Sequence, residues 1–167
     1  LHPAHPFPTL DRWSFALERV AQDPVRAQSL DLRLLQRACD IRRELLDSAP
    51  EMVLLHGDLH HLNILSSKRA GWLLIDPKGV AGERAYEPAS FLVNPEDLMN
   101  APQHIGAVIA KRVEILSDLL ALDYARVIQW AFVHCMLSAC WSVEDGECGA
   151  DALAIARIIE HDHGARL

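Results

Sequence analysis

The sequence predicts a single, mainly α-helical domain with one small β-hairpin near its middle. Half of the 167 residues are hydrophobic and 23% are charged, a balance typical of one globular domain with a packed core. On both sides of residues 52–79, apolar residues recur at three- and four-residue spacing, which predicts amphipathic helices. Between these helical halves, short apolar runs lie on either side of a polar stretch that ends in glycine. This pattern is typical of two strands joined by a turn.

Two helices are expected before the hairpin. The first begins after Thr9, a residue type favoured at the N-cap, and ends near Asp23, because the residue before a proline disfavours the helical conformation. The second begins near Ser29 and ends before Pro50. Its apolar stripe consists of Leu34, Leu35, Ala38, Ile41, Leu45 and Leu46.

The hairpin is expected to consist of residues 64–65 and 72–75, closed by a turn over residues 68–71. A short strand near residues 52–55 is expected to join it. This region is the only one with the sequence pattern of strands, so no other sheet is predicted.

The register of the hairpin predicts a metal site. If Ile64 lies opposite Ile75, then Asn63 lies opposite Asp76 at the open end, with Cβ atoms about 4.5–5.5 Å apart. An amide oxygen and a carboxylate at that separation can share Mg²⁺, which takes few protein ligands and completes its shell with water and substrate phosphates. The hairpin is therefore predicted to act as a metal clamp.

Three helices are expected after the hairpin, over residues 104–120, 124–143 and 150–161. The middle one is apolar nearly all round, which predicts a buried helix. Its longest apolar run, residues 130–141, contains His134 and is shorter than the ~20 residues that a membrane span needs. No membrane partner is expected.

Charge and cysteine usage restrict the partners and the compartment. The net charge of −7 gives no electrostatic support for binding a phosphate backbone, so no nucleic acid partner is expected, and a small cation suits the surface better. The cysteines have no metal-ligand spacing, which predicts reduced thiols and a cytoplasmic protein. They are Cys39, Cys135, Cys140 and Cys148.

A second acidic residue belongs to the same region. Asp58 lies five residues before Asn63, on a turn that contains Gly57, so it can approach the open end of the hairpin. A loop carboxylate beside an Asn/Asp magnesium site is the arrangement used for phosphoryl transfer, in which the loop carboxylate deprotonates an acceptor hydroxyl.

These residues resemble a known family. His56-Gly57-Asp58 with Asn63 matches the HxDxxxxN catalytic loop of protein-kinase-like enzymes, in the HGDLH form typical of aminoglycoside phosphotransferases. Asp76 matches their metal-binding aspartate. The runs HGDLHHLNIL and IDPKGVAGERAYEPASFL look most like the streptomycin 6-phosphotransferase and hydroxyurea phosphotransferase branch. The resemblance covers the middle of the chain.

The resemblance implies a C-terminal lobe of the protein-kinase-like (α+β) fold that uses ATP and Mg²⁺. Its catalytic loop is residues 56–63 and its metal-binding loop is residues 75–79. Asp58 would be the catalytic base, and Asn63 and Asp76 would hold Mg²⁺.

The resemblance leaves two basic residues with open roles and implies one structural histidine. His56 would brace the catalytic loop through hydrogen bonds. His60 stands two residues after the base, where protein kinases often have a lysine near the transferring phosphate. Lys78 could bind a phosphate oxygen of the nucleotide or simply face water.

The resemblance further implies a small-molecule hydroxyl substrate, an aminoglycoside such as streptomycin, and therefore antibiotic resistance. Acidic residues in two places could face a cationic substrate. Glu83 and Glu87 follow the metal-binding loop, and Glu144 and Asp145 follow the apolar helix. Each of them is also explained as an acid that faces water.

The parts of a kinase nucleotide site that precede the catalytic loop are missing from residues 1–55. No glycine precedes Gly57 and no lysine precedes Lys68, whereas a kinase needs a glycine-rich turn and a lysine over the phosphates. We therefore expect residues 1–167 to form one catalytic lobe without the N-terminal lobe, with little activity alone. The apolar surface left uncovered is expected to promote self-association.

Two other classes of protein stay open. The His and Asp residues of HGDLHH suit a metallohydrolase, although that class would leave Asn63 and Asp76 unexplained, and His161-Asp162 is similar to the pair of the helical phosphohydrolases. A kinase-like fold kept as a non-catalytic binding module is the second alternative.

Overall fold

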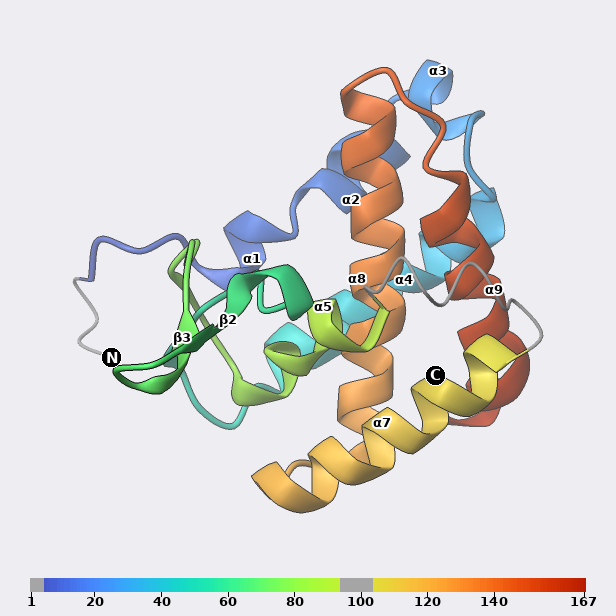
Figure 1. Ribbon diagram of the computed structural model, residues 1–167. Coiled ribbons are helices and arrows are strands. Elements are labelled where there is room, and N and C mark those ends of the chain that lie inside the picture. Colours follow the sequence, from blue (N-terminus) through green and yellow to red (C-terminus); the bar gives the residue numbers. More distant parts are fainter. Residues whose placement is uncertain (1–4, 94–103) are drawn as a thin grey trace.

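The computed structural model describes residues 5–93 and 104–167 of the chain (Figure 1). Helices make up most of this part, and the short strands gather on one side of it. The prediction of a mainly helical chain with little sheet is therefore confirmed.

The first predicted helix is broken in two. α1 (Leu10–Trp13) and α2 (Ala16–Ala21) are separated at Ser14, whose hydroxyl donates to the carbonyl of Leu10 at 2.6 Å. The expectation that the helix would end near Asp23 is correct for α2, but α3 (Pro24–Ala27) begins directly afterwards. The Asp23 carboxylate caps α3, and proline is well tolerated in a first turn.

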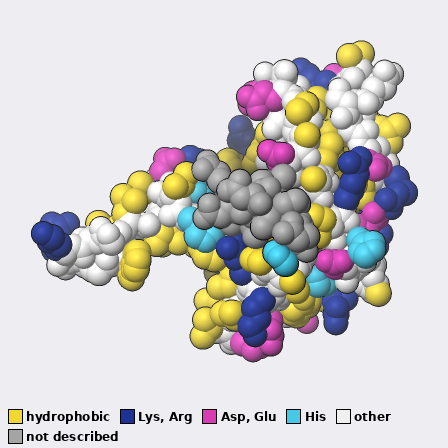
Figure 2. Space-filling view, turned by 45° about the vertical axis from the view of Figure 1, so that its right-hand side comes forward, with side chains coloured by type: hydrophobic (Ala, Val, Ile, Leu, Met, Phe, Trp, Pro, Cys, Tyr) yellow, Lys and Arg dark blue, Asp and Glu magenta, His cyan; other side chains and the backbone are white. Residues whose placement is uncertain are grey.

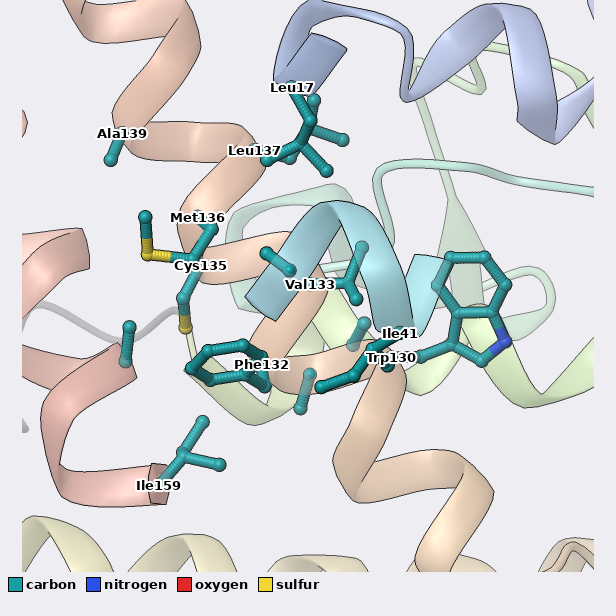
Figure 3. Close-up of a cluster of buried hydrophobic side chains, with 14 of the residues drawn as sticks. Leu17, Ile41, Trp130, Phe132, Val133, Cys135, Met136, Leu137, Ala139 and Ile159 are labelled. Atoms are coloured by element: carbon teal, nitrogen blue, oxygen red, sulfur yellow. The ribbon is translucent and has the colours of Figure 1, made fainter. Parts of the chain in front are cut away.

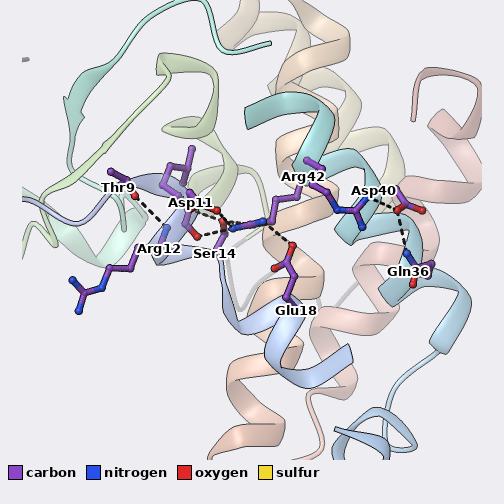
Figure 4. A network of polar contacts seen from close by, with 10 residues as sticks. Thr9, Asp11, Arg12, Ser14, Glu18, Gln36, Asp40 and Arg42 are labelled. Atoms are coloured by element: carbon purple, nitrogen blue, oxygen red, sulfur yellow. Dashed lines mark hydrogen bonds and ion pairs between the residues drawn. The ribbon is translucent and has the colours of Figure 1, made fainter. Parts of the chain in front are cut away.

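A buried arginine explains the break at Ser14 (Figure 4). Arg42, on α4 (Leu32–Asp47), is 3% exposed, and its Nε donates to the Ser14 hydroxyl at 2.7 Å. The same guanidinium donates to Glu18 at 2.7 Å and to the carbonyl of Asp11 at 2.6 Å. Because a buried charge must be paired, this network fastens α1 and α2 to α4.

The helices after the hairpin agree closely with the prediction. They are α7 (Ile105–Leu120), α8 (Tyr124–Glu144) and α9 (Ala150–His163), and a short α5 (Pro88–Val93), which the sequence did not predict, precedes them. α8 runs through the centre of the molecule and packs against α2, α4, α5, α7 and α9 (Figure 1).

Burial on every side of α8 explains its apolar sequence. Figure 3 shows the core around it, in which side chains of α8 meet others from α2, α4 and α9. Among these residues are Leu17, Ile41, Trp130, Phe132, Met136 and Ile159. No helix in the described part of the chain is long and apolar enough to cross a membrane. All four cysteines are free, and three of them are buried.

Two small antiparallel sheets replace the single predicted one. β1 (Val53–Leu55) does not join the hairpin but pairs with β4 (Val80–Gly82), a strand that the sequence did not predict. The pairing of β1 with β4 thus holds together the two ends of the segment that contains the hairpin.

The hairpin itself is formed, but its register differs from the prediction by one residue. β2 (Ile64–Ser67) pairs with β3 (Gly71–Leu74), so that Ile64 lies opposite Leu74 and not Ile75. The cause is Gly71, which pairs with Ser67 at a φ of +75°, a conformation that glycine adopts without strain. The turn therefore holds three residues instead of four.

The hairpin projects from the body as an arm with hydrophobic side chains along it (Figure 2). Trp72 is 71% exposed, and Leu65, Leu73, Leu74 and Ile75 are also exposed. Exposed apolar clusters of this kind mark interaction surfaces.

Candidate active site

The turn at Gly57 places the loop that follows β1. Gly57 has a φ of +82°, and a Cβ atom there would lie 2.7 Å from Cγ2 of Val80, so the position requires glycine. The backbone N–H groups of Lys78 and Gly79 donate to the carbonyl of His56 at 2.8 and 3.2 Å. The loop leading to Asp58 is therefore fastened to the segment that follows β3.

His56 adds a side-chain contact to the same connection. Its Nε2 forms a hydrogen bond with the carbonyl of Ile75 at 2.9 Å, which requires the proton on Nε2 because a carbonyl only accepts. The imidazole thus ties the loop of residues 56–63 to the residue before Asp76.

Asn63, at the end of η1 (His61–Asn63), is buried, with 7% of its surface exposed. Its Nδ2 donates to the backbone carbonyl of Asp58 at 2.9 Å and lies 3.2 Å from Nε2 of His60. Because the amide nitrogen is used in these contacts, Oδ1 is the atom that Asn63 can offer to a cation.

Asp76 and Asp58 meet at one ammonium group. Lys78 Nζ lies 2.6 Å from Oδ2 of Asp76 and 3.7 Å from Oδ2 of Asp58. The hydrogen bond from Lys78 lowers the pKa of Asp76, and the same contact raises the pKa of Lys78. Asp76 has a φ of +54°, so its carboxylate is placed by a backbone conformation that few non-glycine residues adopt.

These contacts bring Asp58, Asn63 and Asp76 to the open end of the hairpin, although not by the predicted register. Asn63 lies opposite Ile75, whose N–H donates to the carbonyl of Asn63 at 3.0 Å, and Asp76 follows one residue later. The Asp76 carboxylate and the Asn63 amide oxygen are hard donors, and this donor set fits Mg²⁺. Among the described residues, no three His, Cys, Asp or Glu side chains form a group that could hold a metal.

The chain matches a family of known proteins. The model of the aminoglycoside/hydroxyurea antibiotic resistance kinases matches residues 1–146. Streptomycin 6-kinase from Streptomyces glaucescens is 33% identical over 129 residues, which cover 77% of this chain and 42% of that protein. The chain belongs to this family of small-molecule kinases.

Two further family members show how much of a full-length relative is represented. Streptomycin 3''-kinase from Klebsiella pneumoniae is 33% identical over 159 residues, which cover 93% of this chain and 54% of that protein. Hydroxyurea phosphotransferase from Kitasatospora aureofaciens is 33% identical over 115 residues, or 69% of this chain and 32% of that protein. The chain spans about half the length of these relatives, or less.

One acidic residue that the sequence suggested for the substrate is buried inside the protein. Glu83 is 2% exposed, and its carboxylate accepts two hydrogen bonds from Arg126, at 2.6 and 2.9 Å, and another from Trp130. This corrects the prediction that Glu83 faces a substrate. Because a buried carboxylate needs compensation, Glu83 and Arg126 form a structural pair between β4 and α8.

Glu87 lies against the loop of residues 56–63. Its Oε2 accepts the N–H of Gly57 at 3.4 Å, directly before Asp58. Burial raises the pKa of Glu87, and hydrogen bonds from the backbone partly offset that rise. The structure therefore places one carboxylate oxygen of Glu87 against the backbone of this loop, which it supports, and Glu87 also lines a pocket beside His56.

Glu144 and Asp145 lie at the C-terminal end of α8, beside α2, at the top of Figure 1, whereas the hairpin projects to the left at the level of the middle of α8. Glu144 forms an ion pair with Arg19 at 2.8 Å, which lowers its pKa. Glu144 is thus already paired with a cationic side chain of this chain, and the role of these two residues toward a cationic substrate stays a prediction.

The structure also shows a buried polar group that sequence reasoning missed. The Tyr86 hydroxyl accepts a hydrogen bond from Nε1 of Trp13 at 3.1 Å and bonds Nδ1 of His134 at 3.0 Å. Burial lowers the pKa of His134 to about 4 and raises the pKa of Tyr86. His134 was visible as the one histidine in an apolar helix, but its partners come from segments far away in the sequence.

Proposed function

We propose that this chain carries the catalytic loop of an ATP- and Mg²⁺-dependent O-phosphotransferase that acts on a hydroxyl group of a small molecule. The observation that supports this most directly is the meeting of Asp58 and Asp76 at one ammonium group, with Asn63 fastened to the backbone of Asp58. This arrangement places a base beside two oxygen ligands for a divalent cation, which phosphoryl transfer requires.

In this proposal Asp58 orients the acceptor hydroxyl and takes its proton. The acceptor oxygen forms a bond to the γ-phosphorus of ATP, the bond from that phosphorus to the bridging oxygen breaks, and ADP leaves. Asn63 and Asp76 would hold Mg²⁺, which when bound neutralises charge on the nucleotide phosphates. His56 and Glu87 keep the loop that carries Asp58 in place through their contacts to the backbone.

The acceptor is proposed to be an aminoglycoside such as streptomycin, because two of the relatives are named as streptomycin kinases. Hydroxyurea is the second candidate, since another relative is named for it. A net charge of −7 favours the approach of a cationic acceptor.

We further propose that residues outside this chain cover the nucleotide. The chain has no glycine before Gly57 and no lysine before Lys68, and it spans only part of its relatives. The exposed apolar hairpin around Trp72 is the surface such residues would cover, and without them it would promote self-association. Sedimentation of the chain, compared with its Trp72→Thr variant, measures that tendency.

The proposal is tested by phosphate transfer from ATP to streptomycin and to hydroxyurea, measured for this chain and for a longer gene product that carries it. In the active form, Asp58→Asn should lower kcat about 10²–10⁴-fold with little change in nucleotide affinity, because it removes the base and no cation ligand. Asp76→Ala should abolish Mg-ATP binding.

The matched control is Asp145→Asn, at an exposed position on the far end of α8. Equal activity of Asp58→Asn and Asp145→Asn would refute the catalytic role. Micromolar binding of Mg-ATP by this chain alone would refute the proposal that the nucleotide cover lies outside it.

A further inference from the structure

Lys78 is an exposed residue, but its ammonium group is engaged. Its side chain is 35% exposed, and Nζ lies 2.6 Å from Asp76 and 3.7 Å from Asp58. The ammonium group therefore lies between the proposed base and a proposed cation ligand. The backbone supports this placement, because the N–H of Lys78 donates to the carbonyl of His56 at 2.8 Å.

The other basic side chain beside Asp58 is used differently. Nε2 of His60 lies 3.7 Å from Oδ1 of Asp58, but the same nitrogen faces the Nδ2 donor of Asn63 at 3.2 Å. A nitrogen that accepts from an amide carries no proton of its own. Among the described residues that contact Asp58, Lys78 is therefore the one that presents a fixed positive charge.

We propose that Lys78 is a catalytic residue: it holds Asp58 and Asp76 together before the reactants bind, and it contacts the transferring phosphoryl group during the reaction. This inference rests on the proposed function. An acceptor hydroxyl must lie within hydrogen-bonding distance of Asp58, and the nucleotide phosphates must lie near Asp76. A group held between the two carboxylates is therefore at the place where the phosphoryl group passes.

The charges allow Lys78 to exchange Asp76 for the phosphoryl group as its partner. A divalent cation that binds Asp76 competes with the ammonium group of Lys78 for the same carboxylate, and the phosphoryl oxygens then offer Lys78 a new negative partner. Charge is spread over these oxygens in the transition state, where a positioned cation stabilises it. Lys78 keeps its protons throughout, since the proton of the acceptor goes to Asp58.

The first test measures Mn²⁺ binding to this chain without nucleotide, by electron paramagnetic resonance. Removing a competing ammonium from an exposed carboxylate should tighten Mn²⁺ binding about two- to fivefold in Lys78→Met. Lys68→Met, in the exposed turn of the hairpin, is the matched control and should bind as the wild type does. Equal affinities for all three proteins would overturn the proposed competition between Lys78 and a divalent cation for Asp76.

The second test measures steady-state kinetics in the active form of the enzyme. Lys78→Met should lower kcat roughly 10²-fold while the KM for the acceptor stays nearly unchanged, and Lys78→Arg should restore part of kcat. A Lys78→Met enzyme as active as the wild type overturns the catalytic role of Lys78. If Lys78→Met is fully active but Asp58→Asn is inactive in the same assay, the proposed function stands without a catalytic role for Lys78. Full activity of Asp58→Asn refutes the proposed function itself.

Discussion

The side-chain amide of Asn63 donates a hydrogen bond to the backbone carbonyl of Asp58, with 2.9 Å between nitrogen and oxygen. The proposed cation ligand and the proposed base are thus joined within one loop. The sequence predicted that the pairing of the two hairpin strands would bring Asn63 opposite Asp76. In the structure Ile75 lies opposite Asn63 instead. The site consequently depends on the loop of residues 58–63 more than on the strands.

Replacing Asn63 by aspartate tests this dependence. A carboxylate would be a stronger cation ligand, but at this buried position its oxygen would face the carbonyl of Asp58 instead of donating to it. We expect Asn63→Asp to lower the free energy of unfolding by about 1–3 kcal/mol, measured by urea denaturation without divalent cations. Gln28→Glu makes the same chemical change at an exposed position, and a similar loss there would contradict this explanation.

The contact of Glu87 with Gly57 gives a second prediction. Glu87→Gln keeps an oxygen that can accept the N–H of Gly57 and removes a charge that burial disfavours, so its stability should stay within about 0.5 kcal/mol of the wild type. Glu87→Ala leaves that N–H without its acceptor and should cost about 1–3 kcal/mol. Hydrogen exchange at residues 56–58 should speed up in Glu87→Ala alone; equal exchange in both variants would exclude a supporting role.

The helices were predictable because their signals are local. Apolar spacing placed α4, α7, α8 and α9 within a few residues, since burial of one face follows directly from a 3.6-residue repeat. The break between α1 and α2 was not predictable in this way. It depends on Arg42, which lies 28 residues beyond Ser14 in the chain.

The candidate site was predictable in its residues but not in its connections. Asp58, Asn63 and Asp76 follow from a motif with fixed spacing, whereas the register followed from the conformation of Gly71, which pattern alone does not specify. Glu83 and Glu87 look alike in the sequence, as acids after the metal-binding loop. Their separate roles depend on Arg126 and Gly57, which lie 43 and 30 residues away.

The burial of Glu83 gives a third prediction. Glu83→Ala leaves Arg126 and Trp130 without their carboxylate and should lower the free energy of unfolding by about 3–5 kcal/mol, as expected when one partner of a buried ion pair is removed. Glu144→Ala removes the carboxylate partner of Arg19, whose side chain is 49% exposed, and should cost at most about 1 kcal/mol. A stable Glu83→Ala protein that has lost acceptor binding would instead favour the original interpretation of Glu83 as a substrate ligand.

The buried imidazole of His134 should make stability depend on pH in a defined direction. Its pKa is about 4 in the folded chain, against an ordinary value of 6.5. Between these two pH values the unfolded chain binds a proton that the folded chain does not, so this contribution is complete above pH 6.5 and is lost as the pH falls toward 4. Tyr86 bonds the ring at Nδ1, and the Asp58 carboxylate favours protonation of the ring, but burial is the dominant cause of the lowered pKa.

The last prediction follows from this loss of stability at low pH. Between pH 7 and pH 4.5, the wild type should lose roughly 2–3 kcal/mol of unfolding free energy through His134 alone. His134→Gln cannot titrate, so its loss over the same interval should be smaller by that amount, even if it is less stable at pH 7 because the contact with Tyr86 is altered. His161→Gln, at a side chain that is 87% exposed, is the control and should follow the wild-type curve. Urea denaturation of the three proteins at both pH values measures the difference. Parallel losses for His134→Gln and the wild type would show that His134 can take up a proton without unfolding, and that burial does not hold it neutral.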